Sequence, residues 1–188
     1  RLEGWNRSLY FDETDLLWIG PSPNIPTLET AILYIGTCLL EGTNVSEGRG
    51  TTKPFEMLGA PWIDAYELND AMNRKGFSGI IFRPAYFTPS FSKHQGQLCG
   101  GVQIHITNKK SIKAFEIGIQ LIYTLMDLYK DNFAFLPPNQ EGSFPFFDLL
   151  AGTDEIRLRS NDFQSMMDHF ALDLQSFSEL KNKYHLYD

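Results

Sequence analysis

Cysteine is scarce in this sequence. Only Cys38 and Cys99 occur in 188 residues, and neither has a histidine or a second cysteine at the spacing of metal ligands. The sequence therefore indicates neither a zinc site nor a disulfide scaffold. We expect no metal and no cofactor, and we expect each cysteine to be a small buried residue.

Runs of positive charge and long apolar runs are also missing. The formal net charge is -7, and lysine and arginine form no cluster. This argues against a nucleic-acid backbone or an anionic membrane surface as the main partner. Polar residues interrupt the longest apolar stretches, residues 31–40 and 117–126, which are too short to span a bilayer. We expect a neutral or small polar ligand, with no nucleic acid and no membrane span.

The first residues lack the features of a leader. The chain opens with RLEGW, without an initiator methionine, a basic region or an apolar region, so we expect any signal peptide to lie in sequence that precedes it.

The chain does contain enough hydrophobic residues to form a core. Hydrophobic residues make up 43%, with 15 Phe, 8 Tyr and 3 Trp, which favours a compact fold. The length of 188 residues allows one domain and a part of another.

Helix and strand signals follow one another along the chain. Thr27 fits the N-cap of a helix that ends at Gly42, and a second helix is expected between Ile63 and Gly76. Apolar periodicity predicts strands and a long helix in the middle of the chain, followed by three short helices packed on the sheet: strands at 80–88 and 102–107 and a helix at 111–129. The fold class is therefore predicted as α/β (α+β), with a small mixed sheet and packed helices.

The densest group of functional side chains follows the first helix, in the sequence EGTNVSEGRGTT. Two carboxylates, an amide, a guanidinium and several hydroxyls lie among glycines, which let the backbone approach a ligand closely. Such a set suits a sugar. The alternative is an ordinary solvated surface loop. A phosphate cradle fits less well, because the glycine spacing of a nucleotide-binding loop is absent.

Glycoside hydrolysis usually needs two carboxyl groups, and Glu41 and Glu47 are the candidates in this segment. The alternative for either glutamate is a salt bridge to Arg49 or a cap on a helix. Outside the segment, His105 lies on the polar face of a predicted strand and is a candidate to orient a substrate, whereas a solvent-facing or core histidine is the commoner case. Trp62 is a candidate for stacking on a sugar ring, against the alternative of core packing.

Several motifs together resemble one family. The chain resembles the exo-β-N-acetylmuramidase (NamZ-type) proteins of glycoside hydrolase family 171, long catalogued as a domain of unknown function. The resemblance extends over essentially the whole chain and rests on PSPNIPT at 21–27, EGTNVSEGRGT at 41–51, GAPWID at 59–64, FRP at 82–84 and CGGVQIHIT at 99–107.

The resemblance implies a two-domain arrangement. In such proteins a Rossmann-like N-terminal domain precedes a smaller α/β domain, and the sugar binds between them. Residues 1–58 then correspond to the tail of the first domain, with a cleft loop at 41–53, and residues 59–188 to the C-terminal auxiliary domain. The glutamate regarded as catalytic in the family belongs to the missing N-terminal domain, so this chain alone is expected to be inactive.

The resemblance also implies a substrate. We expect the full-length protein to remove N-acetylmuramic acid from the non-reducing end of peptidoglycan fragments, with a peptidoglycan-derived sugar or muropeptide and the missing N-terminal domain as partners. The expected location is extracytoplasmic, periplasmic or secreted. Substrate-binding roles are expected for five residues: Asn44, Arg49, Thr51, His105 and Trp62. The alternative is a non-catalytic carbohydrate-binding or interaction module.

Overall fold

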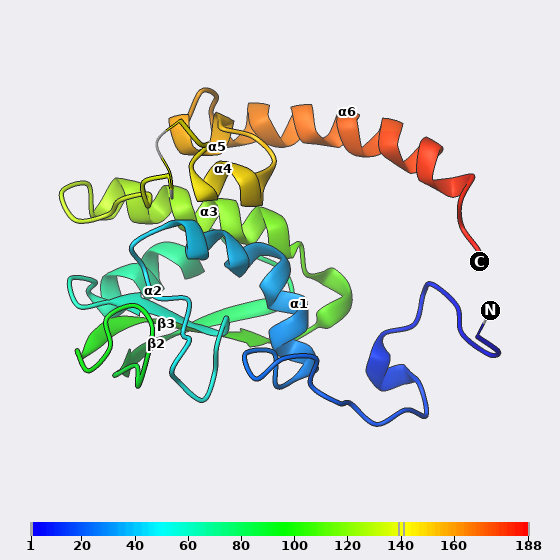
Figure 1. Ribbon diagram of the computed structural model, residues 1–188, viewed down its shortest axis with the longest axis horizontal. Coiled ribbons are helices and arrows are strands. Elements are labelled where there is room, and N and C mark those ends of the chain that lie inside the picture. Colours follow the sequence, from blue (N-terminus) through cyan, green and yellow to red (C-terminus); the bar gives the residue numbers. More distant parts are fainter. Residues whose placement is uncertain (1, 139, 141, 188) are drawn as a thin grey trace. The chain divides into compact units, whose positions relative to one another are not determined.

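The computed structural model describes residues 2–138, 140 and 142–187, which form two compact units (Figure 1). The larger unit spans Gly20–Leu158. The smaller unit combines the residues up to Ile19 with those from Arg159 onwards. The candidate site lies entirely in the larger unit.

The centre of the larger unit is a three-stranded sheet with the order β1-β3-β2. Strand β1 (Met57–Ala60) and strand β2 (Ile80–Phe87) both pair with β3 (Cys99–Ile106). We expected a mixed sheet, and both pairings are antiparallel. The α+β fold class is confirmed, and the Rossmann-like N-terminal domain is not part of this chain.

Side-chain caps define where the first two helices begin, and the cap at Thr27 confirms the sequence prediction. The Thr27 hydroxyl accepts a hydrogen bond from the Thr30 amide at the start of α1 (Leu28–Thr37), which continues into the 3-10 helix η2 (Cys38–Gly42). Asp64 accepts from two amides at the start of α2 (Ala65–Asn73). Helix α2 then packs against β2 and β3 (Figure 1).

Helix α3 (Ala114–Leu128) crosses α1 at a point where both helices carry glycine. A Cβ placed on Gly118 would lie 2.7 Å from the Cα of Gly36, so neither position has room for a side chain. This crossing lets Ile117, Ile119 and Ile122 of α3 become fully buried. Next to it, α4 (Phe146–Ala151) packs on η2 and is followed by α5 (Glu155–Leu158), while the 3-10 helix η3 (Lys109–Ser111) leads into α3.

The smaller unit contains the 3-10 helix η1 (Phe11–Glu13) and α6 (Phe163–Asn182). The backbone amide of Leu2 donates to the Tyr187 hydroxyl at 2.6 Å, and the ring of Trp5 meets the Tyr187 ring edge-on at 4.6 Å. Three helices were expected after residue 138, and the described residues there form α4, α5 and α6. The expectation that all are short and packed on the sheet is wrong for α6, which has 20 residues and belongs to the smaller unit. No helix within the described part of the chain is long and apolar enough to cross a membrane.

The expected division between residues 58 and 59 does not coincide with the division into these two units. Strand β1 extends across this point. Helix α1, which precedes residue 58, packs against α3, which follows it. The assignment of residues 1–58 to the tail of a preceding domain stays a prediction about the longer protein.

Replacing Gly118 with alanine should destabilise the larger unit, because the added methyl group would overlap the backbone of α1. Overpacking of this kind costs about 1–3 kcal/mol in the free energy of unfolding. Chemical denaturation monitored by circular dichroism measures the change. The matched control is Gln120→Ala on the same helix, for which a change within about 0.5 kcal/mol is expected. Equal stability of Gly118→Ala and the control would contradict the close crossing.

Candidate functional site

The segment between η2 and β1 is held down along most of its length. Ser46 exchanges two backbone hydrogen bonds with Gly59 of β1, at 2.8 and 3.0 Å, and the Phe55 amide donates to the Glu47 carbonyl at 2.6 Å. Gly48 has a φ of 83°, and Gly50 has a φ of 81° at a point where a Cβ would collide with the backbone of Phe91. The alternative of a solvated surface loop is therefore wrong.

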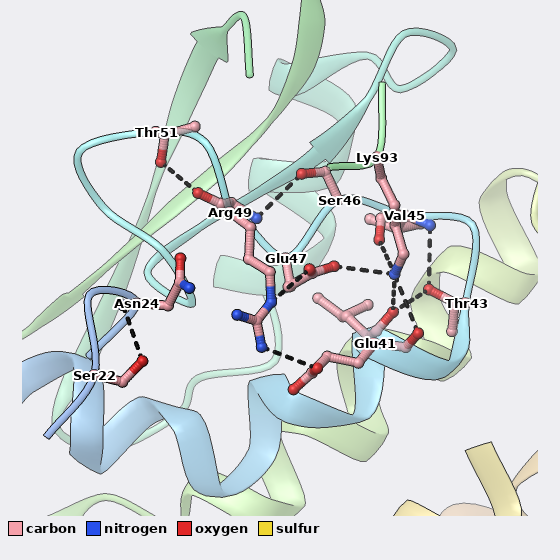
Figure 2. A network of polar contacts seen from close by, with 12 residues as sticks. Ser22, Asn24, Glu41, Thr43, Val45, Ser46, Glu47, Arg49, Thr51 and Lys93 are labelled. Atoms are coloured by element: carbon pink, nitrogen blue, oxygen red, sulfur yellow. Dashed lines mark hydrogen bonds and ion pairs between the residues drawn. The ribbon is translucent and has the colours of Figure 1, made fainter. Parts of the chain in front are cut away.

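Three charged side chains of this segment meet (Figure 2). Arg49 donates through Nη2 to Glu41 Oε2 at 3.1 Å and forms an ion pair through Nε with Glu47 Oε1 at 3.2 Å. The Glu47 side chain is only 3% exposed, whereas Glu41 and Arg49 are 19% and 28% exposed. The cluster thus has a buried side at Glu47 and an open side at Arg49 and Glu41.

Lys93 is the fourth charged member, and it comes from the loop between β2 and β3. Its Nζ lies 3.0 Å from Glu47 Oε2 and donates to the carbonyl oxygens of Leu40 and Val45 at 2.8 and 3.1 Å. Burial lowers the pKa of Lys93, and the negative charge of Glu47 opposes this shift. Sequence reasoning missed this lysine because no motif surrounds it and 46 residues separate it from Glu47.

An aromatic ring lies beneath the guanidinium of Arg49, and a second ring packs against the first. Its Cζ lies 5.0 Å from the centre of the Phe55 ring, a cation–π distance, and the Tyr34 ring of α1 packs edge-on against Phe55 at 4.7 Å. Phe55 is buried and has a φ of 62°, an unusual value for a bulky residue. Burial and the nearby charge of Glu41 raise the pKa of the Tyr34 phenol.

Asn44 and Thr51 shape the backbone around the cluster. The Asn44 side-chain amide donates to the Asn132 carbonyl at 2.7 Å, and its oxygen accepts from the Ala134 amide at 3.0 Å. Thr51 Oγ1 donates to the Gly48 carbonyl at 2.7 Å and accepts from the Lys53 amide at 3.1 Å. These contacts occupy both side chains within the protein, so their predicted substrate contacts stay predictions.

His105 and Trp62 make their contacts elsewhere. His105 is exposed on β3, where Arg83 Nε approaches its Nε2 at 3.4 Å. Trp62 is half-buried and packs at a tilt on Tyr129 with ring centres 5.5 Å apart. None of the contacts found among the described residues joins either side chain to the charged cluster, so their substrate roles also stay predictions.

Residues that follow Arg49 in the chain line a groove of about 440 Å³, and Gly50 is the first of them. Phe91 and Phe87 both line this groove. The Phe91 side chain is half-exposed, whereas Phe87 is buried. All the lining residues are uncharged: Gly50, Thr51, Thr52, Met57, Phe87, Thr88, Ser90 and Phe91. The loop that carries Lys93 therefore also supplies one wall of the groove.

Chemically, the arrangement combines a neutral groove with a charged cluster that has an available donor. Arg49 uses Nε and Nη2 for its two ion pairs, which leaves the N–H groups on Nη1 outside them. Two carboxylates and two cations balance the charge of the cluster. Within the described part of the chain, no group of three or more His, Cys, Asp and Glu side chains is placed to hold a metal ion.

Two comparisons of sequence identify relatives. The family model described as "Exo-beta-N-acetylmuramidase NamZ, C-terminal" matches residues 32–187. The curated "Peptidoglycan beta-N-acetylmuramidase NamZ" of Bacillus subtilis (strain 168) is 44% identical over 190 residues, which cover all of this chain and 44% of the relative. The chain thus spans less than half the length of this relative.

Solved structures agree with this relationship. One protein of the DUF1343 family from Bacteroides fragilis NCTC 9343 superposes with a TM-score of 0.84 at 32% identity, covering 98% of this chain and 49% of the other. A second DUF1343 protein from the same organism has a TM-score of 0.57 at 31% identity, covering 90% and 44%. The chain belongs to the exo-β-N-acetylmuramidase NamZ family and corresponds to its C-terminal part.

Proposed function

We propose that this chain is the C-terminal part of a two-domain glycoside hydrolase that removes N-acetylmuramic acid from the non-reducing end of peptidoglycan fragments. The Bacillus subtilis relative is named a peptidoglycan β-N-acetylmuramidase, which supports this reaction. The relative is more than twice as long as the match, so the proposed activity is that of the longer protein. In it, this chain supplies one wall of the substrate cleft.

The observation that carries the proposal is the partly exposed side chain of Arg49, whose neighbour in the chain, Gly50, lines a neutral groove. N-acetylmuramic acid differs from N-acetylglucosamine by a lactyl ether that ends in a carboxylate. An arginine presents several N–H groups in a planar fork that suits a carboxylate. The free Nη1 of Arg49 is the donor that we assign to the lactyl carboxylate.

The two glutamates of the cluster take different roles in this proposal. Both oxygens of Glu47 face cations, Arg49 on one side and Lys93 on the other, so this carboxylate organises the site. Glu41 is more exposed and uses one oxygen on Arg49, which makes it the better candidate for contact with the substrate. The main catalytic glutamate is assigned to the N-terminal domain, and extracytoplasmic action is proposed because peptidoglycan lies there.

A second candidate function is a carbohydrate-binding module without catalysis. The groove favours it, because the half-exposed Phe91 offers a face for stacking and the neighbouring hydroxyls offer hydrogen bonds to a neutral sugar ring. Under this alternative, the chain binds muropeptides and neither it nor the longer protein releases sugar.

The full-length protein should release the chromophore from a chromogenic N-acetylmuramide, whereas the 188-residue chain should not, because the main catalytic glutamate is assigned to the N-terminal domain. Absorbance measures the release, and circular dichroism confirms that the shorter chain is folded. Binding of muropeptides without release by either protein would favour the binding module. Release by the shorter chain at the full rate would place the catalytic groups within these residues.

Arg49→Met in the full-length protein should lower kcat/KM for a muramide by roughly ten- to a hundredfold, the loss expected for a hydrogen bond to a charged group. The matching glucosaminide, which lacks the lactyl carboxylate, should be almost unaffected. Arg83→Met removes a second arginine of the larger unit, which contacts Gln103 and His105, and serves as the control. An equal loss on both substrates with Arg49→Met would mean that Arg49 only shapes the segment.

A further inference from the structure

Lys93 occupies an unusual position for a lysine. Its ammonium group is enclosed by the end of η2 and the segment after it, with acceptors at the carbonyls of Leu40, Glu41 and Val45 and at the Glu47 carboxylate. The four distances lie between 2.8 and 3.3 Å, and the side chain is 20% exposed. A flexible, strongly hydrated cation is thus held at one place inside the protein.

The loop that carries Lys93 has an unusual backbone conformation on both sides of this residue. Ser92 and His94, on either side of Lys93, have φ values of 72° and 57°. Residues other than glycine adopt this left-handed conformation only at a cost in conformational energy. His94 Nε2 lies 2.7 Å from the Asn44 carbonyl oxygen, and Ser90 donates through both its amide and its hydroxyl to the Gly50 carbonyl, at 2.8 and 2.9 Å. The loop therefore clasps the site segment at Gly50, Glu47 and Asn44.

We propose that Lys93 is a positioning residue that holds Glu47 and cancels its charge, so that Arg49 can receive the carboxylate of an acidic sugar. The inference rests on the proposed function and adds a residue that determines specificity. Lys93 acts through Glu47 and Arg49 and does not itself contact the substrate.

The charges of the cluster explain why a second cation is needed. Glu41, Glu47 and Arg49 alone carry a net charge of −1, and a ligand carboxylate would bring the net charge around the one guanidinium to −2. With Lys93 the cluster is neutral before the ligand binds. Glu47 is 3% exposed, so water screens its charge poorly, and the compensation has to come from a neighbouring cation.

The test compares the binding of N-acetylmuramic acid and N-acetylglucosamine to the full-length protein by calorimetry, which does not require turnover. The wild-type protein should prefer N-acetylmuramic acid. Lys93→Met should reduce this preference by roughly tenfold or more, because the uncompensated charge of Glu47 would weaken the charge-assisted contact between Arg49 and the ligand carboxylate. The double variant Lys93→Met/Glu47→Gln should recover most of the preference, because the remaining pair, Glu41 and Arg49, is again neutral.

The recovery separates the proposed role from a purely structural one. If Lys93 only holds the loop in place, removal of the Glu47 charge as well should not restore selectivity, and this result would overturn the proposal. His94→Ala removes another clasp of the same loop without changing the charge of the cluster, and it should leave the preference intact. A selectivity loss with His94→Ala equal to that with Lys93→Met would likewise overturn it.

Two further outcomes keep the inference distinct from the proposed function. If the wild-type protein shows no preference for N-acetylmuramic acid, the assignment of Arg49 to the lactyl carboxylate fails, and the inference that rests on it fails with it. If the wild type shows the preference and Lys93→Met retains it, only the role of Lys93 is wrong. Should Lys93→Met not fold, Lys93→Gln keeps donors for the carbonyls without the charge and answers the same question.

Discussion

A carboxylate that is removed from water is stable only where cations and hydrogen-bond donors replace the water that it loses. Glu47 imposes this condition on the site, because its side chain is 3% exposed and each of its oxygens faces a different cation. Arg49 reaches it through a turn at Gly48, and Lys93 reaches it from a separate loop. The left-handed residues on either side of Lys93 cost on the order of 1–3 kcal/mol each, so the surrounding contacts must offset that strain.

Much of the fold follows from local signals in the sequence. The caps at Thr27 and Asp64 define helix starts, and the alternation around Gln103 predicts a strand. Strand β1 was not predicted, because it has only four residues and two of them are Gly59 and Ala60, which carry no strand preference. The length of α6 was also not predicted, since its apolar positions resemble those of shorter helices packed on a core.

The candidate site could be predicted only where its members are close in sequence. Glu41, Glu47 and Arg49 fall within one glycine-rich segment, and the alternative that Arg49 pairs with these glutamates agrees with the observed ion pairs. Lys93 is brought to the segment by the antiparallel pairing of β2 with β3, which places the loop between these strands beside it. Such proximity depends on tertiary structure and leaves no local pattern. The same holds for the Phe55 ring beneath Arg49, which depends on a backbone conformation that phenylalanine rarely adopts.

The backbone pairing of Ser46 with Gly59 has a consequence for the motions available to this site. Binding loops are commonly drawn from the least stable parts of a protein, where they open without disturbing the core. Here the segment that carries Glu47 shares hydrogen bonds with a strand whose other edge pairs with β3. Opening of the segment therefore breaks both hydrogen bonds between Ser46 and Gly59, which ties the segment to the edge of the sheet. In the proposed two-domain protein, a wall of this kind would leave closure around a ligand to the N-terminal domain.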